Sequence, residues 1–235
     1  MVLVPGLAMS GAYFLPLANR LAKEHPVQVV ELPGFGRSSG PAEALSMREH
    51  AVWLYDWMQA RGLGACHLVG HSMGCQVAAH LAAAHPEALL TLTLIGPTID
   101  SAAYHRPTQI ARLLRDLWKE KFGVLLRAGL DVWRAGILRT WRTSSEMLAD
   151  RLEQQLARTP TPTLLLRGAD DTIAPESWLQ AAAAFLATGR AQTIPGAAHC
   201  VHFSRPVETA RAILEWAAST NPPGADLRQA SPAEQ

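Results

Sequence analysis

The chain has 235 residues, of which 49% are hydrophobic and 17% charged, and its formal net charge is +1. This length suits one domain with a substantial core, and the near-zero net charge provides no basic field for binding nucleic acid. No run of residues is apolar enough to cross a bilayer, and Pro5-Gly6 ends the first apolar run too early for a signal peptide. We therefore expect a cytoplasmic protein with a small-molecule substrate, and neither a nucleic acid nor a membrane as partner.

Short runs rich in leucine or β-branched residues alternate with longer helical patterns along most of the chain. This alternation is typical of a parallel sheet flanked by helices, so we predict an α/β fold with a mostly parallel sheet of about six strands. The predicted strands are Val2 to Val4, Val27 to Glu31, Cys66 to Val69, Leu90 to Ile95, Thr163 to Arg167 and Ala191 to Ile194.

Four helices are predicted around these strands. Apolar residues at helical spacing predict the first from Tyr13 to Leu21. A capping box starts the second at Ser46, and its pattern continues to Gly62. The third, Met73 to Ala84, is apolar nearly all round and should be buried, and the last covers Val207 to Ala218.

The alternation stops between Thr98 and Thr161, where apolar and aromatic residues at helical spacing predict two or more amphipathic helices. Residues 98–161 are therefore interpreted as a helical insertion into a core made of residues 1–97 and 162–218. Residues 219–235 are rich in proline, serine, glutamine and alanine and cannot bury a core, so we expect them to be disordered.

The three cysteines, Cys66, Cys75 and Cys200, are odd in number and lack the spacing of zinc ligands. Cys66 and Cys75 fall within predicted core elements. We expect free thiols, no metal site and no organic cofactor.

The segment Gly70-His71-Ser72-Met73-Gly74 has the pattern G-x-S-x-G and joins a predicted strand to a predicted helix. A sharp turn at this place lifts the serine hydroxyl above the sheet, and glycines beside it allow the neighbouring backbone to approach. The amino end of the helix favours developing negative charge. Such short patterns also arise by chance in turns, and the strand-to-helix context is what favours Ser72 as a nucleophile.

Through this motif the chain resembles the α/β-hydrolase superfamily, and the resemblance extends from Val2 to Ala218 except for the insertion. It implies the α/β-hydrolase fold with an inserted helical lid. Members usually have two further strands before the strand that this chain starts with. Val27 to Glu31 would then be an exposed sheet edge, and we expect either a longer native form or a homodimer that covers it.

A serine nucleophile needs a base to take its proton, and the chain has nine histidines. His199 follows the last predicted strand in Pro195-Gly196-Ala197-Ala198-His199, which resembles the loop of the family's catalytic histidine. His202 is the alternative base, but the spacing of the family loop favours His199, and His202 is better explained as a packed or solvated loop histidine. The other histidines fall within or at the ends of predicted elements, where a structural role is the better explanation.

The base needs a carboxylate for its other nitrogen. Residues 168–175, Gly-Ala-Asp-Asp-Thr-Ile-Ala-Pro, resemble the family's acid loop G-x-x-D-x-x-x-P, which selects Asp171. Asp100 is the alternative, because some relatives place the acid after the preceding strand. The resulting order of Ser72, Asp171 and His199 is the order of this fold.

The resemblance also implies an oxyanion hole and a pocket. The backbone amides of Met73 and Leu7 would bind the oxyanion, with Pro5-Gly6-Leu7 standing where the family has H-G-x. The expected pocket residues are Phe35, His71, Trp118, Trp133 and Trp141, although each tryptophan is also explained by packing of the lid on the core.

The fold alone does not choose a reaction. The leading expectation is a serine hydrolase that cleaves carboxylic esters of small to medium apolar acyl groups through an acyl-enzyme intermediate. One alternative is a carbon–carbon bond hydrolase for a diketone-like carboxylate, which would suit the eleven basic against seven acidic residues between Asp100 and Arg158. A lactonase or thioesterase is another, and a ligand receptor with little or no turnover is an alternative of a different class.

Overall fold

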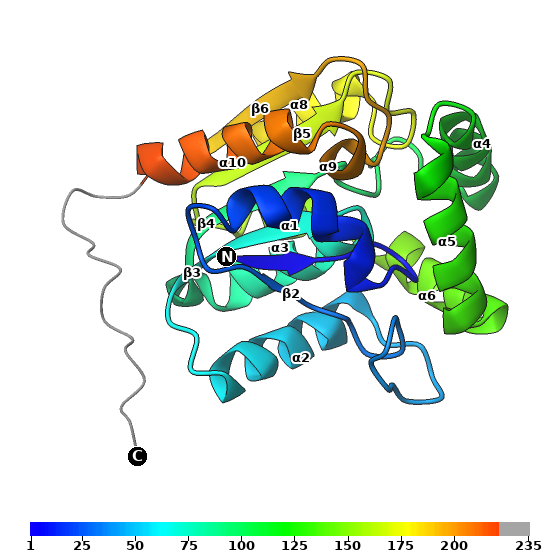
Figure 1. Cartoon of the computed structure of the whole chain (residues 1–235), viewed down its shortest axis with the longest axis horizontal. Coiled ribbons are helices and arrows are strands. Elements are labelled where there is room, and N and C mark those ends of the chain that lie inside the picture. Colours follow the sequence, from blue (N-terminus) through cyan, green and yellow to red (C-terminus); the bar gives the residue numbers. More distant parts are fainter. Residues whose placement is uncertain (221–235) are drawn as a thin grey trace.

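The computed structural model describes residues 1–220 (Figure 1). Six parallel strands form one sheet in the order β2-β1-β3-β4-β5-β6, which confirms the predicted α/β class and six-stranded parallel sheet. The strands are β1 (Val2–Val4), β2 (Gln28–Val29), β3 (Cys66–His71), β4 (Leu89–Ile95), β5 (Thr163–Gly168) and β6 (Gly189–Ile194).

Helices cover both faces of the sheet because successive strand residues point to opposite sides. In β1, Val2 and Val4 pack in the core beneath α2, α3 and α8, whereas Leu3 packs in the core beneath α1 and α10. Figure 1 shows α1 and α10 together on one face. The helices of the two layers are α1 (Leu15–Leu21), α2 (Met47–Ala60), α3 (Met73–Ala84), α8 (Glu176–Ala184), α9 (Val201–Ser204) and α10 (Pro206–Thr220), with 3-10 turns η1 (Gly11–Phe14) and η2 (Pro86–Ala88).

Two of the predicted helices form for the reasons that the sequence gives. The Ser46 hydroxyl accepts a hydrogen bond from the Glu49 amide at 3.2 Å, and the Glu49 carboxylate accepts one from the Ser46 amide at 2.8 Å. This is the predicted capping box of α2. Helix α3 is buried along most of its length, as its apolar composition indicates.

Other boundaries differ from the predictions. β2 contains two residues rather than five, and the Glu31 carboxylate beyond it accepts hydrogen bonds from the amides of Gly11 and Arg37. Helix α8 was not predicted. Ser219, expected in a disordered tail, belongs to α10, where its hydroxyl donates to the Trp216 carbonyl at 2.9 Å. The predicted tail beyond residue 220 lies outside the described residues.

The insertion links β4 to β5 and stands beside the sheet, as Figure 1 shows for α4, α5 and α6. Its helices are α4 (Arg106–Leu117), α5 (Phe122–Ala135), α6 (Ile137–Ala149) and α7 (Leu152–Leu156). Within residues 1–220, no helix combines the length and the apolar character needed to cross a membrane.

Candidate active site

Ser72 occupies a strained turn between β3 and α3. Its φ is 53° and its ψ is −119°, a backbone conformation that residues other than glycine rarely adopt. The flanking glycines are required, because a Cβ at Gly70 would lie 2.4 Å from the Gly74 carbonyl and a Cβ at Gly74 would lie 2.3 Å from the Val4 carbonyl. The tight packing of this turn holds Ser72 at the carboxyl end of the sheet.

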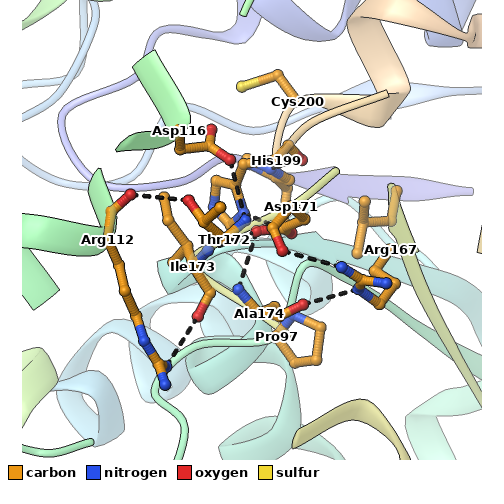
Figure 2. Close-up of polar contacts among 12 residues, drawn as sticks. Pro97, Arg112, Asp116, Arg167, Asp171, Thr172, Ile173, Ala174, His199 and Cys200 are labelled. Atoms are coloured by element: carbon orange, nitrogen blue, oxygen red, sulfur yellow. Dashed lines mark hydrogen bonds and ion pairs between the residues drawn. The ribbon is translucent and has the colours of Figure 1, made fainter. Parts of the chain in front are cut away.

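The loops after β5 and β6 bring Asp171 and His199 together in the buried interior (Figure 2). The Nδ1 atom of His199 lies 2.9 Å from Oδ2 of Asp171. The other carboxylate oxygen, Oδ1, accepts hydrogen bonds from the amides of Ile173 at 2.8 Å and Ala174 at 2.9 Å. These two amides fix the carboxylate so that Oδ2 faces the imidazole.

The end of β4 places His199 next to Ser72. The Ser72 amide donates to the Ile95 carbonyl at 3.0 Å, and a Cβ on the following residue, Gly96, would lie 2.8 Å from His199 Nδ1. The remaining ring nitrogen of His199, Nε2, is buried and has no hydrogen-bond partner among the described residues. It is therefore the atom that is free to accept a proton.

The charge around His199 makes it a stronger base than an ordinary histidine. Burial acts to lower its pKa, but the charge and hydrogen bond of Asp171, followed by the charges of Asp116 and Glu120, raise the pKa to about 9. The buried carboxylates thus outweigh the cost of placing a charged imidazolium in the interior.

Asp116 and Glu120 come from the end of α4 and the turn after it, and the sequence analysis did not select them. Asp116 Oδ1 accepts from the Thr172 amide at 3.2 Å, and Glu120 Oε1 accepts from the Cys200 amide at 2.6 Å. Thr172 directly follows Asp171, and Cys200 directly follows His199. These hydrogen bonds therefore attach the insertion to both loops of the site. Burial raises the pKa of both carboxyls. No local signal in the sequence marks either residue, because both bind loops 56 and 80 residues away.

Tyr13 was also missed, and with His71 it connects three loops of the site. The Tyr13 hydroxyl accepts from the Gly6 amide at 2.7 Å and lies 2.7 Å from His71 Nδ1, while His71 Nε2 lies 3.2 Å from the His199 carbonyl. Burial lowers the pKa of His71 well below its ordinary value, so its neutral ring accepts at Nδ1 and donates at Nε2. His71 was predicted to line the pocket, but it is buried and links loops instead.

The loop after β1 lies against Ser72, where an oxyanion hole would form. A Cβ at Gly6 would lie 3.2 Å from the Ser72 Cβ. Met73 is the first residue of α3, and an amide at that position has no partner within its own helix. The roles of the Leu7 and Met73 amides remain predictions that this placement permits.

The other predicted pocket residues do not line an enclosed pocket. Phe35 is buried in the core and stacks on His50. Trp118, Trp133 and Trp141 are 92%, 77% and 52% exposed. That these residues cover the nucleophile stays a prediction.

Both alternative site residues have structural roles. Asp100 lies 2.7 Å from the Arg112 guanidinium and accepts from the Ala102 amide. His202 is packed between the rings of Tyr13 and His71, and burial lowers its pKa to about 3. The geometry favours Asp171 over Asp100 and His199 over His202.

We expect Tyr13→Phe to lower stability by about 1–3 kcal/mol, because it leaves the buried Gly6 amide and His71 Nδ1 without a partner. Since the Gly6 loop would also loosen, kcat should fall more than KM rises. Chemical denaturation and steady-state kinetics measure the two effects. Tyr55→Phe is the matched control, because the Tyr55 ring stacks on His85 at the surface. Equal stability of both variants would contradict the structural role of the Tyr13 hydroxyl.

A serine on a strained strand-to-helix turn, with a buried histidine and carboxylate from the loops of the following strands, is the arrangement of a hydrolytic enzyme. Residues 1–212 match the alpha/beta hydrolase family. The chain belongs to this family, which confirms the resemblance seen in the sequence, and it is a hydrolase.

Relatives with reported names include hydrolases of different specificity. The chain is 25% identical over 244 residues to a putative carbamate hydrolase of Serratia proteamaculans (strain 568), covering 94% of this chain and 91% of that one. It is 38% identical over 96 residues to a pimeloyl-[acyl-carrier protein] methyl ester esterase of Aeromonas hydrophila, covering 40% of this chain and 36% of that one. A solved hydrolase from Oleispira antarctica shares the fold, with a TM-score of 0.81, 14% identity, and coverage of 92% of this chain and 90% of that chain.

Proposed function

We propose that the protein is a serine hydrolase that cleaves carboxylic esters of small to medium apolar acyl groups. The observation that carries this proposal is the orientation of His199, which is bound to Asp171 through Nδ1 and has a free Nε2 beside the strained Ser72 turn. A histidine held in this way is suited to take a proton from a serine hydroxyl.

In the proposed reaction, His199 Nε2 removes the Ser72 proton as the serine oxygen attacks the ester carbonyl. The oxyanion that forms is bound by the Leu7 and Met73 amides. His199 then gives the proton to the leaving alcohol, and the acyl group stays on Ser72. A water molecule, deprotonated by His199, releases the acid and restores the serine.

The choice of an ester rests on the family and on a named ester-cleaving relative. A carbamate is the second candidate substrate, because relatives that match over nearly the whole chain bear the name putative carbamate hydrolase. Both substrates present a carbonyl with a heteroatom leaving group, so the same serine mechanism serves them. A panel of matched ethyl esters and ethyl carbamates would separate the two.

The proposal is tested with p-nitrophenyl acetate and butyrate and with a fluorophosphonate probe, which labels activated serines. We expect turnover of both esters and labelling at Ser72, located by mass spectrometry of the digested protein. Tight binding of an ester without turnover or labelling would favour a ligand receptor instead.

The activity should depend on the protonation of His199, which must be neutral to act as a base. Because the pKa of His199 is raised to about 9, kcat/KM for p-nitrophenyl acetate should rise with pH with a midpoint near 9. Glu120→Gln keeps the acceptor for the Cys200 amide but removes a negative charge, so the midpoint of this rise should move to lower pH. An unchanged midpoint would contradict the charge effect, and rates with Ser72→Ala provide the background of spontaneous hydrolysis.

A further inference from the structure

Helix α4 is amphipathic, but its polar side faces the core. Arg112, Asp116 and the following Glu120 contact Asp100, the acid loop and the histidine loop. The opposite side of the helix is mostly apolar, and its apolar residues are exposed: Ile110, Leu113, Leu114, Leu117 and, just after the helix, Trp118. A surface helix normally buries such a stripe, so α4 has an unpartnered apolar side.

The next helices continue the same arrangement. In α5, Asp131 points inward and accepts from the Ser10 amide at 3.0 Å and the Ser10 hydroxyl at 2.7 Å. Val124 and Val132 of this helix pack towards the core, but Phe122, Leu126, Leu130 and Trp133 are exposed, and so are Ile137 and Leu138 at the start of α6. We call the exposed residues of all three helices the apolar face of the insertion: Ile110, Leu113, Leu114, Leu117, Trp118, Phe122, Leu126, Leu130, Trp133, Ile137, Leu138 and Trp141.

The charges around this face have one sign. Between Arg106 and Arg142 the sequence has nine basic residues and three acidic ones. All three acids, Asp116, Glu120 and Asp131, accept hydrogen bonds from core loops. Five of the basic residues are exposed. Lys119 and Lys121 donate to the carbonyls of Asp170 and Ser204, and Arg134 lines a cavity with Ser10. Arg115 and Arg142 lie beside the apolar face. The outer surface of the insertion therefore combines large apolar side chains with positive charge.

We propose that the apolar face of the insertion binds the surface of an anionic lipid bilayer. Leucine, phenylalanine and tryptophan side chains enter the boundary between headgroups and acyl chains, and the surrounding cations bind anionic headgroups. A second copy of the chain fits this face less well, because two copies meeting here would bring like charges together.

This binding goes beyond ester hydrolysis and is independent of it. The sequence analysis predicted no membrane partner because it considered only segments that cross a bilayer, and the proposed binding differs from that prediction. A helix that lies in the membrane surface needs no spanning length. Since α4 also holds the loops of Asp171 and His199, docking here would place the site next to the lipid.

The proposal is tested by sedimentation of the full chain with vesicles. We expect binding to vesicles of phosphatidylcholine mixed with phosphatidylglycerol, and much weaker binding to phosphatidylcholine alone. Arg142→Ala should weaken binding to the anionic vesicles about fivefold, the effect of one surface cation. High salt should weaken it further, because salt screens the attraction.

A triple variant, Leu114→Ser with Phe122→Ser and Ile137→Ser, removes one exposed apolar residue from each helix and should abolish sedimentation with vesicles. Val52→Ser is the matched control, because Val52 on α2 is 52% exposed but lies outside the apolar face. Hydrolysis of p-nitrophenyl acetate and circular dichroism report whether the variants are folded.

The proposal is overturned if wild type does not sediment with anionic vesicles. It is also overturned if light scattering finds a dimer that the triple variant dissociates while no vesicle binding occurs. Because the soluble ester is assayed without lipid, a failure of the proposed hydrolase function would appear in that assay alone and would leave the vesicle result standing.

Discussion

Replacing Ser72 with alanine is expected to lower kcat for p-nitrophenyl acetate at least about a thousandfold, since a remaining rate can come from binding and the oxyanion hole alone. The hydroxyl is the only atom removed, and the small side chain still fits the strained turn. In this reaction the covalent step depends on Ser72 Oγ, so His199 and Asp171 cannot compensate for its loss. The measurement is a steady-state assay of pure protein with the uncatalysed rate subtracted.

Ser101→Ala is the matched control, because Ser101 is an exposed serine in the loop that begins the insertion. It should keep wild-type kcat and still react with the fluorophosphonate. Labelling should disappear only in Ser72→Ala. If Ser72→Ala retains most of the activity, the nucleophile has been assigned to the wrong residue.

The sheet and the turn around Ser72 were predictable because their signals are local. The alternation of strands and helices depends on neighbouring residues, and the glycines of the Ser72 motif are required by backbone contacts within a few ångströms. The loops of Asp171 and His199 each follow a strand of the parallel sheet, so topology alone brings them to the same edge.

The remaining features depend on contacts between distant segments. Nothing near Glu120 in the sequence reveals that it accepts a hydrogen bond from the Cys200 amide, 80 residues away. Nor does the amphipathic pattern of α4 tell which side faces the core, since a helical pattern fixes the spacing of apolar residues and not their partner. The tryptophans were placed over the pocket because the insertion of the family forms a lid there, and in the structure their side chains are exposed.

Replacing Asp171 with asparagine is expected to lower kcat by about ten-thousandfold, although the side chain keeps its shape. The amides of Ile173 and Ala174 both donate to Oδ1, so the oxygen of asparagine must stay on that side. Its amide nitrogen then faces His199 Nδ1 and donates to it. Nδ1 becomes an acceptor, the ring proton moves to Nε2, and Nε2 can no longer take the proton of Ser72.

Asp100→Asn is the matched control for this change. Its Oδ1 can still accept from the Ala102 amide, while the ion pair with Arg112 is lost, so we expect a modest loss of stability and little change in kcat. Loss of the Asp171 charge should also lower the pKa of His199, because that charge is the largest influence raising it. A steep fall with Asp100→Asn and near-normal turnover with Asp171→Asn would instead assign the acid to the loop after β4, and the hydrogen bond between Asp171 and His199 would then be structural.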